Sequence, residues 1–474
     1  MICSGWGLSR ELYIIYALKF LSSFSYFSFS LALVLYLSEA LGLSDVAAGW
    51  WYGVYGVLTS VFGVAAGYAI DHWGVRRSLL VGSMLGTAAR LLFAVWQRQA
   101  AALTLLATLL PFAECLGVPV LTISVKRYTC DQRGKRTMAF SVFYAVMNVA
   151  ALVAGPSVEL WHAHGRLTGV FVSCAVSSAL MGVLAFWAVD EVEMDTNGRM
   201  RAFVSPYGGE SWSAAIRRIG REVQFWRLVA MTLLLVGARL LFRHLDATLP
   251  KYMTRVFGPD APFGFVYALN PFLIVTLVPL IARLTHHIDH FTMILYGSFL
   301  SGLSAFWMLL GDRYWTVVLF VVTLSLGEAV YSPRVYDYTM AIAGRGSEGA
   351  YTSLASVPLF GVQLVTGWMS GELLQRFCPA APISARHTHT MWLIIALSTI
   401  WSPVCMWLCR GWLSQYKEEA HREVPSGREE EDAVEVDGSG KDGRERKGDE
   451  WMEDGDIAAP VTDGIRREDV GVRA

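Results

Sequence analysis

Residues 67–77 read GYAIDHWGVRR, and this short polar stretch lies between two long apolar runs. It contains an acid, Asp71, followed by the turn residue Gly74 and the bases Arg76 and Arg77. A glycine permits a tight reversal of the chain because it lacks a Cβ atom. Arginines next to a membrane span stay on the cytoplasmic side and bind anionic headgroups. The stretch therefore predicts a cytoplasmic loop that joins two transmembrane helices.

The composition argues against an ordinary soluble protein. Hydrophobic residues make up 54% of the 474 residues and charged residues 17%, whereas soluble domains carry about 25% charged residues. The charge is also uneven. Ser414–Ala474 holds 19 acids and 10 bases, a net charge of −9, which leaves +8 for residues 1–413. A basic apolar body with an acidic tail is typical of a membrane protein and not of a nucleic-acid-binding protein.

Further apolar runs make up most of the chain. A transmembrane helix needs roughly 20 mostly apolar residues, and twelve runs meet this requirement. Only helices and closed barrels satisfy their backbone hydrogen bonds in lipid, and these runs are too long for barrel strands. The sequence therefore predicts an all-α membrane protein with twelve transmembrane helices. The helices are expected at residues 12–40, 46–70, 78–97, 101–125, 137–160, 168–189, 225–255, 262–285, 291–311, 314–343, 349–376 and 389–413.

Lysine and arginine indicate the orientation because they accumulate in cytoplasmic loops. With the N-terminus inside, the inner loops hold fourteen of these residues and the outer loops hold seven. We therefore expect both termini in the cytoplasm. The pattern does not distinguish the plasma membrane from an organellar membrane.

The longest internal polar segment, Asp190–Gln224, separates the first six helices from the last six. Within it, apolar residues recur at a helical period over Ser211–Val223. This pattern predicts an amphipathic helix that either lies on the inner leaflet or forms a solvated linker. The acidic tail lacks such a period and is expected to be disordered. The expected units are a six-helix bundle over 1–190, a linker over 191–224, a second six-helix bundle over 225–413 and the cytoplasmic tail over 414–474.

The opening stretch resembles the signature loop of the major facilitator superfamily. Its pattern, G-x-x-x-D-x-x-G-x-R-R, is filled by Gly67, Asp71, Gly74, Arg76 and Arg77. The resemblance implies two six-helix bundles that rock around a site near the middle of the bilayer. It also implies that the loop acts as a gate latch, in which a charge pair holds one arrangement of the bundles and breaks on rocking.

Ionisable residues at membrane depth are costly and therefore point to a functional site. In the major facilitator fold, helices one, four, seven and ten line the central cavity, and each carries charge here. Mixed charges favour a zwitterionic or anionic solute, and carboxylates at this depth are candidates for proton coupling. The alternative is that the charges pair with each other and hold helices together, without a ligand. The charged residues on the four helices are Lys19, Glu114, Arg239, Arg243, Asp246 and Glu328; Arg239 and Arg243 share a helix face, and Asp246 is placed to pair with Arg243.

Several segments resemble the proton-coupled oligopeptide transporter family within this superfamily. The resemblance implies that Glu328 receives a peptide's amino group and that Tyr144 and Asn148 of helix five face the cavity, with Tyr26 in the helix-one motif. The matching segments, in chain order, are FSYF (24–27), LVLYL (33–37), FYAVMN (143–148), LNPFLIVTLVPLIA (269–282) and GEAVYSP (327–333).

Helix one departs from that family in one respect. The family carries E-x-x-E-R before this FSYF segment, where it relays protons and holds the peptide carboxylate. Here the same place reads KFLSS over residues 19–23, so Lys19 replaces the first acid. The substrate is therefore expected to be small and polar, either peptide-like, zwitterionic or anionic. Protons, sodium or no ion at all remain the alternatives for coupling.

Catalytic and cofactor motifs are missing from the sequence, which shows no phosphate loop, nucleophile elbow or zinc-binding pattern. We therefore expect a secondary transporter without cofactor or metal, and not an enzyme. Its expected partners are a small-molecule substrate, the lipid bilayer and protons as a candidate coupling ion, with no nucleic acid, and the chain is expected to be a monomer. The alternative function is a solute sensor or receptor that uses a transporter fold without transport.

Overall fold

The computed structural model describes residues 9–129, 133–194, 199–203, 212–221, 226, 229–230, 233–285, 288, 290–342, 348–381 and 386–410. Some side chains inside its helices, including that of Asp71, lie outside this description. The described chain is almost entirely helical. Nine of its helical segments are long and apolar enough to span a membrane.

The first helices, here called the N-half, lie close to the predicted ranges. They begin and end at predicted positions within a few residues because long apolar runs are the strongest local signal in the sequence. The N-half consists of α1 (Arg10–Leu35), which continues as the π-helical turn η1 (Tyr36–Ala40), α2 (Asp45–Val95), α3 (Gln99–Ala107), α4 (Leu109–Arg127), α5 (Arg133–Ala163) and α6 (Thr168–Ala188).

The predicted reversal at Gly74 is confirmed. Helix α2 is two helices joined across Gly74, whose φ of 81° and ψ of 178° are not helical. A φ in this range is strained for residues with a Cβ atom. The turn therefore needs only one residue, so the polar stretch joins two helices with almost no loop.

One predicted helix is broken in the structure. The run expected over 101–125 is divided at Thr108, which has a φ of −131° and a ψ of −85°. Pro111 follows three residues later and has no N–H to continue the hydrogen bonds of the preceding turn. The helix therefore ends before this proline and starts again as α4.

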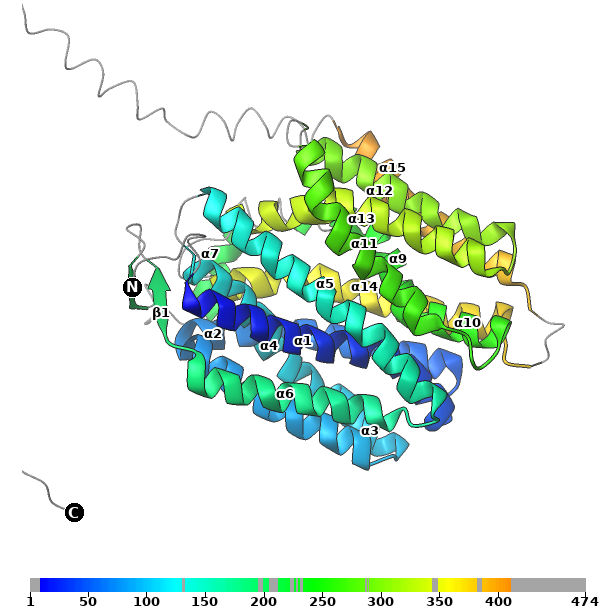
Figure 1. Cartoon of the computed structure of the whole chain (residues 1–474), viewed down its shortest axis with the longest axis horizontal. Coiled ribbons are helices and arrows are strands. Elements are labelled where there is room, and N and C mark those ends of the chain that lie inside the picture. Colours follow the sequence, from blue (N-terminus) through cyan, green and yellow to red (C-terminus); the bar gives the residue numbers. More distant parts are fainter. Residues whose placement is uncertain are drawn as a thin grey trace, which may run out of the picture. The chain divides into compact units, whose positions relative to one another are not determined.

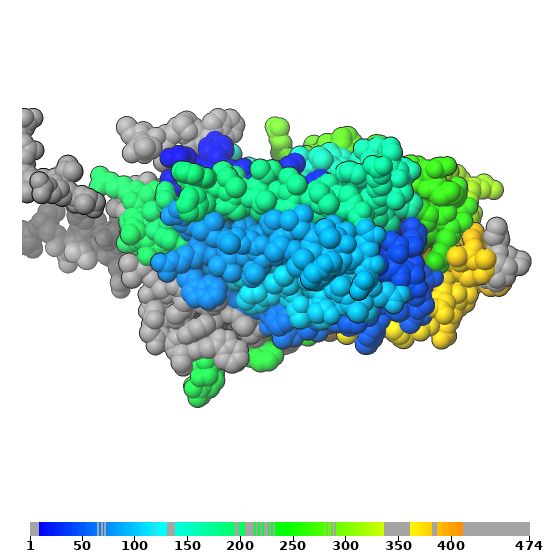
Figure 2. All heavy atoms as spheres, turned by 90° about the horizontal axis from the view of Figure 1, so that it is seen from below, coloured from blue at the N-terminus to red at the C-terminus, as the bar shows by residue number. Residues whose placement is uncertain are grey.

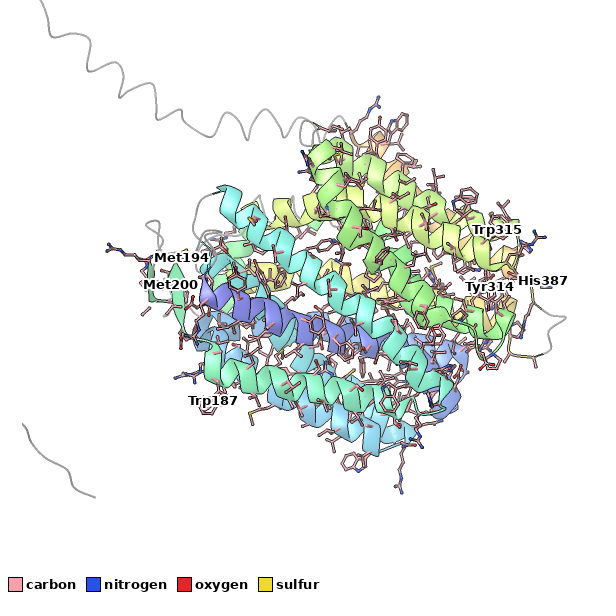
Figure 3. All side chains as sticks on the ribbon, viewed as in Figure 1. Trp187, Met194, Met200, Tyr314, Trp315 and His387 are labelled. Carbon is pink, nitrogen blue, oxygen red and sulfur yellow. The ribbon has the colours of Figure 1, made fainter. Side chains whose placement is uncertain are left out.

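The linker contains a hairpin that the sequence pattern did not predict. Strand β1 (Val192–Met194) pairs antiparallel with β2 (Met200–Ala202), with Glu193 opposite Arg201. Figure 3 shows Met194 and Met200 side by side on this hairpin. Three-residue strands are too short to give a readable alternation. The predicted helix in the linker is present as α7 (Trp212–Arg221).

The remaining helices, here called the C-half, also follow the predicted ranges. One difference is a break at Thr248, and Pro250 at the start of the next helix explains it in the same way as Pro111. The C-half consists of α9 (Val236–Ala247), α10 (Leu249–Phe257), α11 (Phe263–Leu284), α12 (His290–Ser304) with the 3-10 turn η2 (Ala305–Leu310), α13 (Tyr314–Ile342), α14 (Glu348–Phe377) and α15 (Thr388–Leu408).

The two halves pack against each other along two helix pairs. Helix α2 lies along α14, and α5 lies along α11, as Figure 1 shows for the second pair. Within the N-half, α1 packs against α5 and α6. Residues from both halves therefore meet along the centre of the bundle.

The outer faces of the helices carry exposed apolar side chains, as lipid contact requires. On α6 these recur every three or four residues, which places them on one face. Figure 2 shows the side of the molecule to which α6 and the second part of α2 contribute. Exposed aromatic residues mark both ends of the bundle in Figure 3, with Trp187 at one end and Tyr314 and Trp315 at the other. The stripe on α6 consists of Val172, Val176, Leu180, Val183 and Trp187.

Candidate functional site

Glu328 of α13 lies where the two halves meet. Its Oε1 accepts a hydrogen bond of 3.2 Å from the Tyr144 hydroxyl of α5, and its Oε2 accepts one of 3.0 Å from Nδ2 of Asn270. The same Asn270 nitrogen donates to Oγ of Ser325 at 3.0 Å. Glu328 thus binds one group from the N-half and one from the C-half.

The sequence places Tyr144 and Asn148 on one face of α5 because they are four residues apart. The Asn148 amide is buried and donates to the backbone oxygen of Tyr144 at 2.8 Å. Arg239 of α9 interacts electrostatically with Glu328. Its buried Nε atom has no hydrogen-bond partner among the described residues. This region therefore combines a bound carboxylate with an incompletely bonded guanidinium.

A second polar cluster surrounds Asp246 of α9. Its Oδ2 accepts hydrogen bonds from Arg243 at 3.3 Å, from Ser30 of α1 at 3.1 Å and from Tyr52 of α2 at 3.4 Å. The predicted pair between Arg243 and Asp246 is therefore present. The Arg243 guanidinium also lies 5.8 Å from the ring centroid of Tyr26. Asp246 thus links the C-half to the first two helices of the N-half.

Glu114 lies inside the N-half. Arg90 donates to its Oε2 at 2.8 Å and to Oγ of Ser178 at 3.1 Å. A cavity of about 20 Å³ beside them is large enough for about one water molecule. Pairing among buried charges is the alternative that the sequence left open, and the structure shows it for Glu114 with Arg90. The carboxylate of Glu114 therefore links α4 to α2 within the N-half.

Lys19 is also buried, with 5% of its surface exposed. Its Nζ atom lies 4.6 Å from the ring centroid of Phe143 on α5, a cation–π contact, and it interacts electrostatically with Glu114. Phe143 directly precedes Tyr144, which binds Glu328. Neighbouring residues of α5 therefore contact the lysine of the N-half and the glutamate of the C-half.

The end of the bundle that carries the signature loop is here called the Gly74 end. Glu191, which follows α6, accepts backbone hydrogen bonds from Val75 at 3.0 Å and Arg76 at 2.6 Å. N–H groups in the first turn of a helix have no acceptor within that helix, and an anion such as the Glu191 carboxylate is favoured there. The Arg76 side chain donates to the backbone oxygen of Phe186 at 2.7 Å.

For the remaining residues of the signature loop, the structure describes the exposure of Gly67 and Arg77 but not the side chain of Asp71. Gly67 is buried in α2, and Arg77 is exposed. The side chain of Asp71 lies outside the described residues, so the charge pair expected of it does too. Glu191 gave no recognisable signal in the sequence because its role depends on how α6 ends beside α2.

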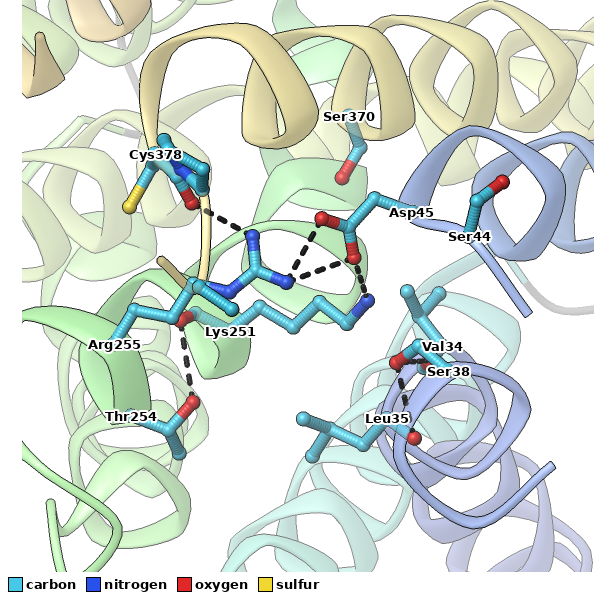
Figure 4. Close-up of polar contacts among 12 residues, drawn as sticks. Val34, Leu35, Ser38, Ser44, Asp45, Lys251, Thr254, Arg255, Ser370 and Cys378 are labelled. Atoms are coloured by element: carbon cyan, nitrogen blue, oxygen red, sulfur yellow. Dashed lines mark hydrogen bonds and ion pairs between the residues drawn. The ribbon is translucent and has the colours of Figure 1, made fainter. Parts of the chain in front are cut away.

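The opposite end of the bundle is here called the Asp45 end, and ion pairs join the halves there. Asp45, the first residue of α2, pairs with Lys251 and, at 2.8 Å, with Arg255 (Figure 4). Arg255 also donates to the backbone oxygen of Cys378 at 2.7 Å. We call Asp45, Lys251 and Arg255 the Asp45 latch. The sequence interpretation did not select these residues, since each stands at a helix end where surface charges are common.

The charge state of the latch follows from its surroundings. Burial raises the pKa of Asp45, but Lys251 and Arg255 together lower it by more, so its pKa lies below the ordinary value of 3.8. Asp45 is therefore ionised at neutral pH, and its attraction to both bases is fully available.

Glu159 of α5 forms a second link between the halves at the Asp45 end. Its Oε2 accepts from the backbone N–H groups of Gly264 at 2.8 Å and Phe265 at 3.0 Å. These residues begin α11, so the carboxylate binds the positive end of that helix. One turn later, the His162 ring packs edge-on against Phe263, with ring centroids 5.4 Å apart.

Glycines allow the backbones of the two halves to touch at the Asp45 end. A Cβ atom on Gly49 of α2 would lie 2.1 Å from the backbone oxygen of Gly367 on α14. Similarly, a Cβ atom on Gly155 of α5 would lie 2.4 Å from the backbone oxygen of Gly264 on α11. Small residues at these crossings permit the close approach. The Asp45 end is therefore closed by tight packing as well as by charge.

The described residues contain no group of three or more His, Cys, Asp or Glu that could hold a metal ion. The pair His286 and His287, with Asp289 nearby, lies outside these residues. Several described charges instead form hydrogen-bonded pairs between helices, such as Arg90 with Glu114 and Arg255 with Asp45. Such an arrangement can bind a polar solute and can also hold one conformation of the halves.

Comparisons with known proteins agree with this architecture. The family model described as Major Facilitator Superfamily matches residues 15–366. An uncharacterized MFS-type transporter, YqjV of Bacillus subtilis (strain 168), is 22% identical over 367 residues, which cover 74% of this chain and 83% of that protein.

Solved transporter structures share the fold. A POT family transporter in complex with 5-aminolevulinic acid has a TM-score of 0.68 at 16% identity and covers 86% of this chain and 97% of its own. A peptide transporter POT in complex with sulfate has a TM-score of 0.65 at 18% identity, with 85% and 94% covered. The nucleoside transporter NupG has a TM-score of 0.62 at 12% identity, with 84% and 99% covered. At these identities the likeness shows the fold alone, and it is the fold that the sequence predicts.

Proposed function

The chain belongs to the major facilitator superfamily, and we propose that it is a secondary transporter that moves a small zwitterionic or anionic solute by alternating access. Family and fold make it a multi-pass membrane transporter and not an enzyme. The solute class, the coupling and the orientation in the membrane are the proposed parts.

The observation that carries the proposal is the position of Glu328 between the halves. Tyr144 reaches it from the N-half and Asn270 from the C-half. An ammonium group that binds Glu328 competes with the Tyr144 hydroxyl and so alters a contact between the halves. A solute that binds one arrangement of the halves better than the other shifts the balance between them.

The neighbouring Arg239 supports a solute that also carries a negative group. Arg239 lies near Glu328 and has a buried Nε atom without a partner among the described residues. An anionic group of the solute would complete its hydrogen bonds. One of the similar structures contains 5-aminolevulinic acid, which combines an ammonium and a carboxylate. We use this compound as the first probe of the proposed solute class.

The proposed coupling site is Glu328 as well. A carboxylate that exchanges its hydroxyl and amide partners during transport is suited to gain and lose a proton. Lys19 stands where the peptide transporters carry acids, so the proton pathway of that family is not carried over to helix one. We propose that protons, if they couple transport, act at Glu328.

We propose that the Gly74 end faces the cytoplasm. Arg76 and Arg77 at this end and the basic residues of the neighbouring loops support this orientation. The Asp45 end then faces outward. In this proposed orientation, the Asp45 latch joins the halves on the outward side.

The proposal is tested with the full chain reconstituted in proteoliposomes. Uptake of labelled 5-aminolevulinic acid and of a dipeptide is measured with and without an inward proton gradient. We expect uptake above protein-free vesicles, with a loss of about tenfold or more in the Glu328→Gln variant, since one hydrogen-bonded charge contributes about 1.5–3 kcal/mol. The control is Glu372→Gln, which changes a partly exposed glutamate paired with Arg376 on α14. It should stay within about twofold of the unaltered chain.

Two results would count against the proposal. Unchanged uptake in Glu328→Gln would remove Glu328 from the site. Binding of the probe by purified protein without any uptake would favour the alternative function of a solute sensor or receptor.

A further inference from the structure

The Asp45 end contains a second cavity, separate from the region around Glu328. It measures about 500 Å³, within the range of roughly 300–1,000 Å³ that is usual for small-molecule sites. Its walls come from both halves. The N-half contributes Glu39, Asp45 and His162, and the C-half contributes Thr254 and Arg255. We call this cavity the Asp45 vestibule.

Besides Asp45, which pairs with Arg255, the walls of the Asp45 vestibule carry the acid Glu39 and the base Arg255. Glu39 has 42% of its side chain exposed and is bound by His162 at 3.1 Å. Arg255 has 14% of its side chain exposed and pairs with Asp45 at 2.8 Å. A purely anionic ligand would face Glu39, and a purely cationic ligand would face Arg255. A ligand with both charges satisfies both walls.

Binding in this cavity would act directly on the contact between the halves. A ligand carboxylate that pairs with Arg255 competes with Asp45 for the same guanidinium. Asp45 is the only acid that the described residues place in an ion pair with Lys251 and Arg255. Weaker binding of Asp45 loosens the Asp45 latch and so favours opening at this end. The cavity therefore combines recognition of a ligand with release of the contact that closes it.

We propose that the Asp45 vestibule is a binding site for a small zwitterion, with the ligand carboxylate on Arg255 and the ligand ammonium on Glu39. The ligand is of the class proposed for the transported solute, so this inference rests on the proposed function. It shares no residue with the region around Glu328. The solute would bind here first, loosen the Asp45 latch and then reach the centre.

The test measures protection of a single introduced thiol in the full chain, purified in lipid nanodiscs. Thr254→Cys places the thiol in the wall of the vestibule, and Gln97→Cys places a control thiol on an exposed loop at the same end. Formation of a mixed disulfide between the introduced thiol and a charged methanethiosulfonate, with release of methanesulfinate, is followed with three probes: 5-aminolevulinic acid, levulinic acid without the amine, and methyl 5-aminolevulinate without the carboxylate. The native Cys378 is buried there, and burial raises the pKa of its thiol to about 11, so it reacts slowly.

We expect 5-aminolevulinic acid to slow disulfide formation at position 254 about fivefold or more and to leave the rate at position 97 unchanged. The other two probes should protect less than about twofold. Glu39→Gln should abolish the difference between 5-aminolevulinic acid and levulinic acid, because it removes the partner of the ammonium. The protection should persist in the Glu328→Gln background.

Three outcomes would overturn the inference: no protection at position 254, equal protection by levulinic acid, or protection that disappears in Glu328→Gln. The last outcome would assign the effect to the centre of the protein. Failure of the proposed transport function would give a different result from failure of this inference. In that case protection would persist at position 254 while proteoliposomes show no uptake, and the vestibule would be the site of a receptor.

Discussion

Tyr144 of α5 donates a 3.2 Å hydrogen bond to Glu328 of α13 and thereby joins the N-half to the C-half. The preceding residue, Phe143, packs under the ammonium of Lys19 within the N-half. Two adjacent residues of α5 thus contact Lys19 and Glu328, the charged residues that the sequence analysis selected in helices one and ten. Movement of α5 relative to α13 must change the environment of Glu328.

The Tyr144→Phe variant removes this bond and keeps the ring. A hydrogen bond to a charged group contributes about 1.5–3 kcal/mol, and about 1.4 kcal/mol corresponds to tenfold in rate. We therefore expect initial uptake of 5-aminolevulinic acid to fall by about tenfold, measured in proteoliposomes. The exposed Tyr296 provides the matched control, and Tyr296→Phe should have no effect. Equal uptake by both variants would contradict a role of this bond in transport.

The Asp45→Asn variant should open the Asp45 end. Removing one partner of a buried ion pair costs about 3–5 kcal/mol, because the other charge loses its counterion, and only 12% of the Asp45 side chain is exposed. We expect a larger population with separated halves, measured as spin-label distances between α2 and α14 by pulsed electron paramagnetic resonance. Asp260→Asn, at an exposed position near the same end, is the control. Identical distance distributions in the two variants would argue against a latch.

The charge of Asp45 in the latch should be insensitive to pH in the physiological range. The pKa of Asp45 is lowered from 3.8 by Lys251 and Arg255, which outweigh the opposing effect of burial. A lowered pKa means that the stabilisation is complete above the ordinary value and is lost only as the pH falls through the lowered one. Between about pH 5 and pH 8 the unaltered chain and Asp45→Asn should therefore give pH profiles of uptake with the same midpoint. A shifted midpoint in Asp45→Asn would show that Asp45 titrates in this range.

The glycine crossings predict opposite effects for two substitutions in one helix. Gly367→Ala would place its Cβ atom 2.2 Å from the backbone oxygen of Gly49, whereas Gly361→Ala meets no atom within 4 Å. Overpacking costs about 1–3 kcal/mol, while alanine favours a helix over glycine by about 1 kcal/mol. Thermal unfolding in detergent should show a lower melting temperature for Gly367→Ala and an equal or higher one for Gly361→Ala. A higher melting temperature for Gly367→Ala would mean that α2 and α14 do not approach so closely.

The Glu191→Gln variant tests the loop at the Gly74 end. It removes the negative charge that binds the N–H groups of Val75 and Arg76. Loss of such a cap costs about 1 kcal/mol of stability. The control is Arg201→Gln, because the Arg201 side chain is 53% exposed and exposed charges contribute little to ion-pair stability. Thermal unfolding should separate the variants, and equal melting temperatures would exclude a capping role for Glu191.

The sequence by itself determined the helices and the turn between two of them. Apolar runs of this length and a glycine between charged residues are local properties, so α6 begins at the predicted residue 168 and Gly74 makes the predicted reversal. The pair of Arg243 and Asp246 could also be predicted, since residues three apart lie on one helix face. The break at Thr108 was missed although its cause, Pro111, is local.

Only the tertiary structure decided which charges meet. Glu114 was predicted to line the central cavity, but the packing of the helices places its carboxylate in an ion pair with Arg90. In the sequence, Asp45 is an ordinary acidic residue at a helix end. The packing of α2 against the C-half places it in ion pairs with Lys251 and Arg255. An ion pair needs a few ångströms between groups that are up to 210 residues apart in the chain. That distance depends on how helices pack, which no local pattern of residues encodes.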